Sequence, residues 1–149
     1  MNKRWTVVLG VLMIGVGTSV SSASDQIRNS PQAGGRTYAQ NYRDMVLATC
    51  IATAYRGDAD AAKDAGSSVS ALRDWTYYDI DEASHAIHDL VKDYLDRDYH
   101  NPVVEAEVKG VRFDLLKCLD LYHSDELKGQ VQRWVSPPDH TYRQDNPAP

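Results

Sequence analysis

Apolar side chains recur three or four positions apart through most of the chain between Tyr38 and Val135. This spacing places them on one face of an α-helix, whereas a half-buried strand requires strict alternation. The clearest segment is residues 79–97, whose apolar stripe comprises Ile80, Ala83, Ile87, Leu90, Val91 and Tyr94. No segment shows convincing strand alternation. The pattern predicts an all-α fold, a compact bundle of about five helices around one core.

The helix boundaries are predicted from residues that cap or stop helices. Gly57 fits the position just past the end of the first helix. Asp58 can cap a second helix, which runs to about Arg73. Ser124 can cap the last helix, which Pro137 stops. The helix before it is expected to turn five residues inward, namely Val111, Leu115, Cys118, Leu119 and Tyr122.

The first 23 residues have the layout of a secretory signal peptide. Lys3 and Arg4 form a positive start, an apolar run ends at Val16, and Ser21–Ala23 supplies the small residues that a signal peptidase reads. The run is shorter than the ~20 apolar residues of a membrane-spanning helix. Cleavage after Ala23 is therefore expected, with an uncleaved anchor as the alternative. The cleaved chain is expected in the periplasm, free of the membrane.

The rest of the chain divides into three parts. Residues 24–37 are polar and contain Pro and Gly, which predicts a flexible leader. Residues 38–136 form the helical domain, and residues 137–149 form a polar, proline-containing tail that is also expected to be flexible.

The charge balance restricts the possible partners. The chain carries 16 Lys and Arg against 21 Asp and Glu, and loss of Lys3 and Arg4 changes the net charge from −5 to −7. Nucleic-acid binding requires clustered basic residues, so this acidic chain is not expected to bind nucleic acid. An acidic surface is compatible with a basic protein partner.

The two cysteines, Cys50 and Cys118, both lie on inward faces of predicted helices. An even pair in an oxidising compartment usually forms a disulfide, with two free buried thiols as the alternative. Closing a loop of this length contributes roughly 4 kcal/mol in the chain-entropy model. We expect one intrachain disulfide.

The sequence offers little catalytic chemistry. It has no Gly-rich phosphate loop, no nucleophile elbow and no Cys-x-x-Cys, and a disulfide removes both thiols as nucleophiles. His85, His88 and Asp89 can share one helix face, which is one possible metal site if His100 or His123 completes it. The alternative is a solvent-facing polar surface. We expect a protein that is not an enzyme and has no metal or other cofactor.

One sequence block resembles that of a known family. Lys117–Leu127 is similar to the lysine-cysteine, aspartate-x-tyrosine-histidine-serine, glutamate-leucine block of the fourth family of immunity proteins against type VI secretion amidase effectors. Ala48–Tyr55 resembles the cysteine block in the first helix of the same family. The resemblance covers about residues 40–135.

The resemblance implies a helical, periplasmic protein that commonly forms a homodimer. Its partner would be a cognate amidase, a papain-like Cys–His hydrolase that cuts the peptide stems of peptidoglycan. Members block the catalytic cleft with a helix and a protruding loop from different subunits. Here these would be residues 79–97 and 98–108. The candidate partner-binding residues are His85, Asp89, Asp98, Tyr99, His100, Asn101, Pro102 and Glu105.

Two other functions remain open at this point. One is a periplasmic metal-binding or redox-active protein that uses the histidines or cysteines. The other is an envelope adaptor with no amidase partner.

Overall fold

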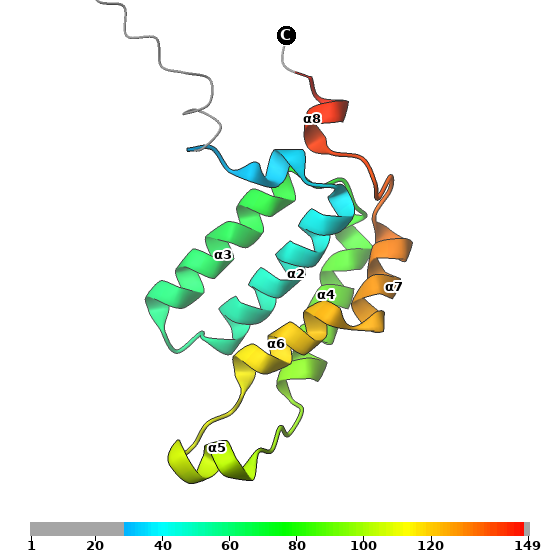
Figure 1. Cartoon of the computed structure of the whole chain (residues 1–149). Coiled ribbons are helices and arrows are strands. Elements are labelled where there is room, and N and C mark those ends of the chain that lie inside the picture. The colour runs from blue at the N-terminus through cyan, green and yellow to red at the C-terminus, as the bar shows by residue number, and fades with distance from the viewer. Residues whose placement is uncertain (1–28, 148–149) are drawn as a thin grey trace, which may run out of the picture. The chain divides into compact units, whose positions relative to one another are not determined.

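The computed structural model describes residues 29–147, and the predicted signal peptide lies outside them. The elements in chain order are η1 (Gln32–Gly35), α2 (Tyr38–Ala54), α3 (Ala59–Asp74), α4 (Ile80–Leu95), α5 (Pro102–Glu107), α6 (Asp114–His123), α7 (Asp125–Trp134) and α8 (Tyr142–Asp145) (Figure 1). The described residues form helices and two isolated bridges, which confirms the predicted all-α class. None of these helices is long and apolar enough to span a membrane.

Helix α2 lies at the centre of the bundle and packs against α3, α4, α6 and α7 (Figure 1). Its inward residues Tyr42, Met45, Val46 and Cys50 are almost fully buried. Met45, Val46 and Cys50 lie three, four and eight positions after Tyr42, so the helical period puts all four residues on one face. The stripe read from the sequence is therefore the centre of the core.

The predicted capping residues begin the helices as expected. The Asp58 carboxylate accepts a hydrogen bond from the Ala61 amide at the start of α3, and the Ser124 hydroxyl accepts one from the Leu127 amide at the start of α7. Each cap satisfies a backbone donor that the first turn of a helix leaves unpaired.

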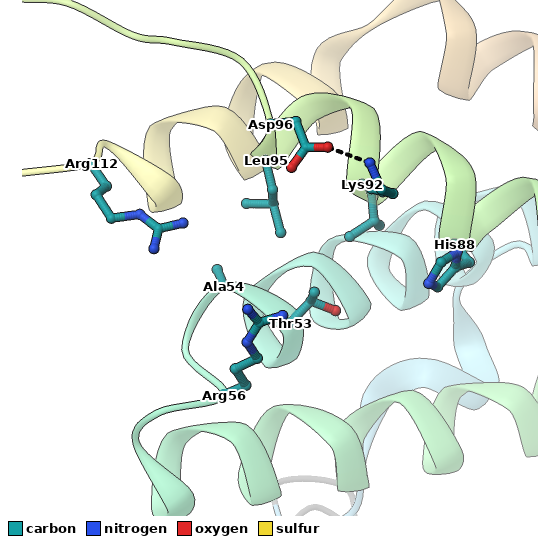
Figure 2. Close-up of a pocket in the computed structure, with 9 residues that line it drawn as sticks. Thr53, Ala54, Arg56, His88, Lys92, Leu95, Asp96 and Arg112 are labelled. Atoms are coloured by element: carbon teal, nitrogen blue, oxygen red, sulfur yellow. Dashed lines mark hydrogen bonds and ion pairs between the residues drawn. The ribbon is translucent and has the colours of Figure 1, made fainter.

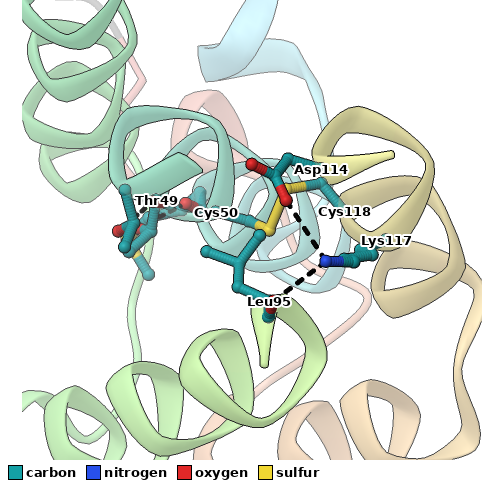
Figure 3. The surroundings of a disulfide bond; sticks show 8 residues. Thr49, Cys50, Leu95, Asp114, Lys117 and Cys118 are labelled. Atoms are coloured by element: carbon teal, nitrogen blue, oxygen red, sulfur yellow. Dashed lines mark hydrogen bonds and ion pairs between the residues drawn. A yellow bond between two sulfur atoms is a disulfide. The ribbon is translucent and has the colours of Figure 1, made fainter. Parts of the chain in front are cut away.

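The predicted disulfide joins Cys50 of α2 to Cys118 of α6, with their Cα atoms 5.7 Å apart (Figure 3). Next to it lies Lys117, which is only 5% exposed. Its ammonium group donates to the carbonyl oxygen of Leu95 at 3.1 Å and contacts the Asp114 carboxylate at 3.3 Å. Leu95 ends α4, where the helix dipole favours a positive charge.

The predicted inward face of α6 is partly wrong. Leu115 and Leu119 are 47% and 40% exposed, whereas Lys117, Cys118 and Leu121 are buried. The disulfide fixes which side of α6 faces α2. Lys117 and Leu121 lie four positions apart on that side, next to Cys118. The two leucines are turned away from the core.

The segments before α2 and after α7 contact each other. Thr37 and Thr141 form an antiparallel bridge, and the Tyr38 amide donates to the His140 carbonyl oxygen at 2.8 Å. The buried Tyr38 hydroxyl donates to the Asp145 carboxylate, also at 2.8 Å. The composition of both segments predicts flexibility, and their pairing has no counterpart in the sequence pattern.

Candidate partner-binding surface

Residues 98–110 form an arm that leaves the bundle after α4 and returns to α6 (Figure 1). The sequence predicts an irregular loop here, but the arm contains the short helix α5. The Asn101 side chain accepts a hydrogen bond from the Val104 amide, and Pro102 occupies the first helical position. A cap followed by proline is a recognised helix start, but a helix of six residues is too short to show a period.

Three of the candidate residues hold the arm in shape. The Glu105 carboxylate accepts from the Asn101 amide at 2.7 Å and contacts the His100 imidazole at 3.0 Å. The first of these bonds satisfies the backbone donor of the capping residue, as a capping box does. The start of the arm is thus ordered before any partner arrives.

Tyr99 connects the base of the arm to α6. Its hydroxyl donates to the Asp120 carboxylate at 2.6 Å, and this hydrogen bond raises the pKa of Tyr99 above its ordinary value. The Lys117 ammonium group lies 5.9 Å from the centre of its ring. Tyr99 therefore fixes where the arm begins.

An exposed apolar surface adjoins the arm. It consists of Leu115, Leu116 and Leu119 on α6 and the half-buried Phe113 before them. Phe113 and Leu116 share an open cavity of about 320 Å³ with loop residues 98–101. A contiguous apolar patch of this kind is typical of a surface that another molecule covers.

Sequence reasoning missed this surface because it assigned Leu115 and Leu119 to the core. The available signal was that apolar residues occupy more than one side of α6, which a helix with one packed face does not need.

Phe113 has a left-handed backbone conformation, with φ at 55°. This conformation costs a non-glycine residue roughly 1–2 kcal/mol. Strained residues of this kind cluster at active sites, ligand clamps and switch regions. Phe113 also lines a second open cavity of about 530 Å³, on the side of Leu115 and Leu119. The strained turn thus places one aromatic ring between the arm and the leucines.

Val103 is the most exposed of the large apolar residues described, at 75%. It lies in the first turn of α5, which buries none of its own residues. The charged side chains of the arm that make no ion pair within the described chain are two carboxylates, Asp98 and Glu107, and one cation, Lys109. The arm therefore presents an apolar side chain with carboxylates near it.

His85 and Asp89 lie on the exposed face of α4, one helical turn apart. They precede the end of α4 at Leu95 by ten and six residues, which corresponds to roughly 15 and 9 Å along the helix axis. The structure brings the loop candidates together but places these two on a separate surface. Among the residues described, no group of three His, Cys, Asp or Glu side chains is arranged to hold a metal ion.

The chain is a disulfide-bridged helical bundle with a preformed arm and an exposed apolar surface. These features are typical of small protein-binding domains. A model of the family described as type VI secretion system amidase immunity proteins, Tai4, matches residues 40–131, more than half of the chain. The chain belongs to this family of immunity proteins.

Solved structures agree with this assignment. One, from work on type VI-secreted toxins and self-resistance proteins of Serratia marcescens, is 27% identical with a TM-score of 0.70, and the match covers 80% of this chain and 94% of that one. Another, from the Tae4/Tai4 effector–immunity system of Salmonella typhimurium, has the same fold at 22% identity and a TM-score of 0.60, covering 70% and 96%. No curated protein matches the sequence closely enough to serve as a relative.

Proposed function

We propose that the chain protects its host by binding a cognate peptidoglycan amidase in the periplasm and occluding the catalytic cleft of that enzyme. The amidase is expected to be a papain-like Cys–His hydrolase, and the immunity protein needs no catalytic group or cofactor of its own. Membership of the amidase immunity family supports the choice of partner.

The preformed arm is the observation that carries the mechanism. A cleft that binds an extended peptide can be filled by a narrow segment, and α5 with its loop is the narrow segment of this structure. Because Asn101, Glu105 and Tyr99 already hold the arm in shape, binding loses little conformational entropy. Occlusion then requires only affinity and shape.

A homodimer is part of the proposal. His85 and Asp89 lie on a different surface from the arm, so one amidase can contact the α4 face of one subunit and the arm of the other. A second subunit would also give the exposed Leu115, Leu116 and Leu119 an apolar partner. Both statements predict that the chain purifies as a dimer.

The test is co-purification with the amidase encoded by the neighbouring gene, followed by a peptidoglycan hydrolysis assay. The exposed Val103→Asp substitution should weaken inhibition at least tenfold without changing the melting temperature, because Val103 makes no core contact. Ser67→Asp, which adds the same charge on an exposed part of α3, should inhibit like the wild type.

The outcomes separate the two parts of the proposal. A wild-type chain that neither binds nor inhibits the amidase contradicts the function. Full inhibition by the Val103→Asp variant, with the wild type active, contradicts only the assignment of the arm to the cleft.

A further inference from the structure

A groove runs along α2 between α3 and α4, and its charged residues are mostly basic. Its wider part, about 340 Å³, is lined by Arg56, Lys92 and Arg112 (Figure 2). Its narrower part, about 160 Å³, is lined by Arg73. His88 lines both parts, so they meet at its imidazole. We call this the basic groove.

The positive charges of the basic groove are incompletely neutralised within the described chain. Asp96 is the one carboxylate among its lining residues, and it pairs with Lys92, which lowers the pKa of Asp96. Arg112 Nε lies 3.2 Å from the Asp114 carboxylate, and Asp114 also contacts Lys117. One carboxylate is thus shared between two cations, so the positive charge of Arg112 is only partly neutralised.

Arg56 makes no ion pair or hydrogen bond with any residue that the structure describes. It lies in the turn between α2 and α3, and Figure 2 shows its guanidinium group directed toward the same space as that of Arg112. One unpaired guanidinium group, that of Arg56, and one that shares its carboxylate with Lys117, that of Arg112, thus face one cavity in a chain whose net charge is −5. Mutual repulsion of like charges would favour separation, so a bound anion would stabilise this arrangement.

The floor of the basic groove is less polar than its rim. Ala54, Val91 and Leu95 supply apolar surface. The hydroxyls of Thr49 and Thr53 donate to carbonyl oxygens of their own helix, at 2.8 Å in each case. An apolar floor under a basic rim suits the aliphatic stem of a glutamate or aspartate whose carboxylate reaches the rim.

We propose that the basic groove binds an acidic, extended segment of the amidase, whose carboxylates pair with Arg56 and Arg112 and, further along, with Arg73. The planar guanidinium group binds a carboxylate through two parallel hydrogen bonds, which gives direction as well as attraction. This inference rests on the proposed function, because it assigns the acidic segment to the same partner.

The proposal adds a source of specificity. The arm carries three carboxylates against one lysine, and the basic groove presents guanidinium groups, so the two surfaces favour opposite charges on the partner. A related amidase with the reversed arrangement would meet like charges at both surfaces, which costs binding energy. The pair of surfaces therefore defines both the choice of partner and its orientation.

The experiment measures amidase affinity by calorimetry at low and high salt. The Arg56→Gln/Arg112→Gln double variant should bind at least tenfold more weakly at low salt and lose much of the salt dependence of the wild type. The matched control is Lys63→Gln/Lys128→Gln, which removes the same charge from exposed positions on α3 and α7. It should stay within twofold of the wild type. The Arg56→Lys/Arg112→Lys double variant should recover part of the affinity, because it keeps the charge but loses the planar geometry.

Equal affinities of the groove variant and the control, with both chains folded, would overturn the inference and leave the proposed function intact. If the wild type does not bind the amidase, the proposed function fails, and titration with an octaglutamate peptide then tests separately whether the basic groove binds acidic peptides. Amide NMR shifts confined to Thr49, Thr53 and His88, absent in the groove variant, would support an acidic-peptide site. No localised shifts would overturn it.

Discussion

The buried tyrosine hydroxyls set the response of the fold to alkaline pH. Tyr42 is fully buried, and its hydroxyl donates to the Gln130 side chain at 3.1 Å. Burial raises the pKa of Tyr42 above its ordinary value, because a phenolate there would lose its hydration. The neutral form is therefore tied to the folded state.

This linkage predicts a loss of stability at high pH. In the unfolded chain the hydroxyl of Tyr42 has the ordinary tyrosine pKa of about 10, whereas its pKa in the folded chain is higher. Above about pH 10 the hydroxyl therefore loses its proton in the unfolded state but keeps it in the folded state, which favours unfolding. The free energy of unfolding should fall as the pH rises from 10 to 11, as measured by urea denaturation. Tyr42→Phe should show a smaller fall across the same interval. An unchanged pH dependence in that variant would contradict the assignment.

Some single-residue roles follow from the sequence and others do not. Asp58 and Ser124 were predicted as caps, because a capping side chain acts on a backbone amide three residues away. The burial of Lys117 was not predictable, since lysine is almost never buried without a partner. Its partners, Leu95 and Asp114, come together only when α4 and α6 pack.

At the scale of elements, α5 depends on its cap more than on packing. Asn101→Ala removes the hydrogen bond to the Val104 amide and should cost about 1 kcal/mol of helix stability. Amide exchange in Val104–Val108 should then be about fivefold faster. The melting temperature should not change, because α5 buries none of its residues.

The control for this helix is Asn101→Asp, which restores a capping oxygen and should restore slow exchange. Slow exchange in the Asn101→Ala variant would show that contacts other than the cap hold α5 in place.

The sequence predicts the elements whose packing is periodic and long. Helix α4 is predicted at residues 79–97 and occupies Ile80–Leu95, since its five buried residues repeat over about three turns. Helix α5 was missed because its six residues contain no repeat. The rotation of α6 was misjudged because Leu115, Leu116 and Leu119 compete with Cys118 and Leu121 for the inward side, and only the tertiary fold decides between them.

At the scale of the whole molecule, the disulfide joins segments that are 68 residues apart. The Cys50→Ser/Cys118→Ser double variant should lower the free energy of unfolding by ~2–5 kcal/mol, because the open chain gains conformational entropy when unfolded. Urea denaturation of the wild type with and without a reducing agent provides the comparison. Identical midpoints under both conditions would contradict a stabilising bridge.

The sequence also predicts the fold class of the whole molecule better than it predicts the contact between its first and last described segments. Periodicity and the cysteine pair were sufficient for a bridged helical bundle, and the Lys117–Leu127 block for the family. The pairing of residues 37–39 with residues 138–141 has no local signal, because it is made mostly by backbone groups that any residue carries.

The meeting of these two segments makes the described chain nearly a closed ring. They pair at the end of the bundle remote from α5 (Figure 1). A short linker from residue 146 to residue 31, with new ends opened beside the exposed Gly57, would keep every helix and change only their order along the chain. In the natural order, a reporter or tether joined at either of these segments starts from the end of the bundle opposite the arm, so fusions at these segments leave the arm accessible.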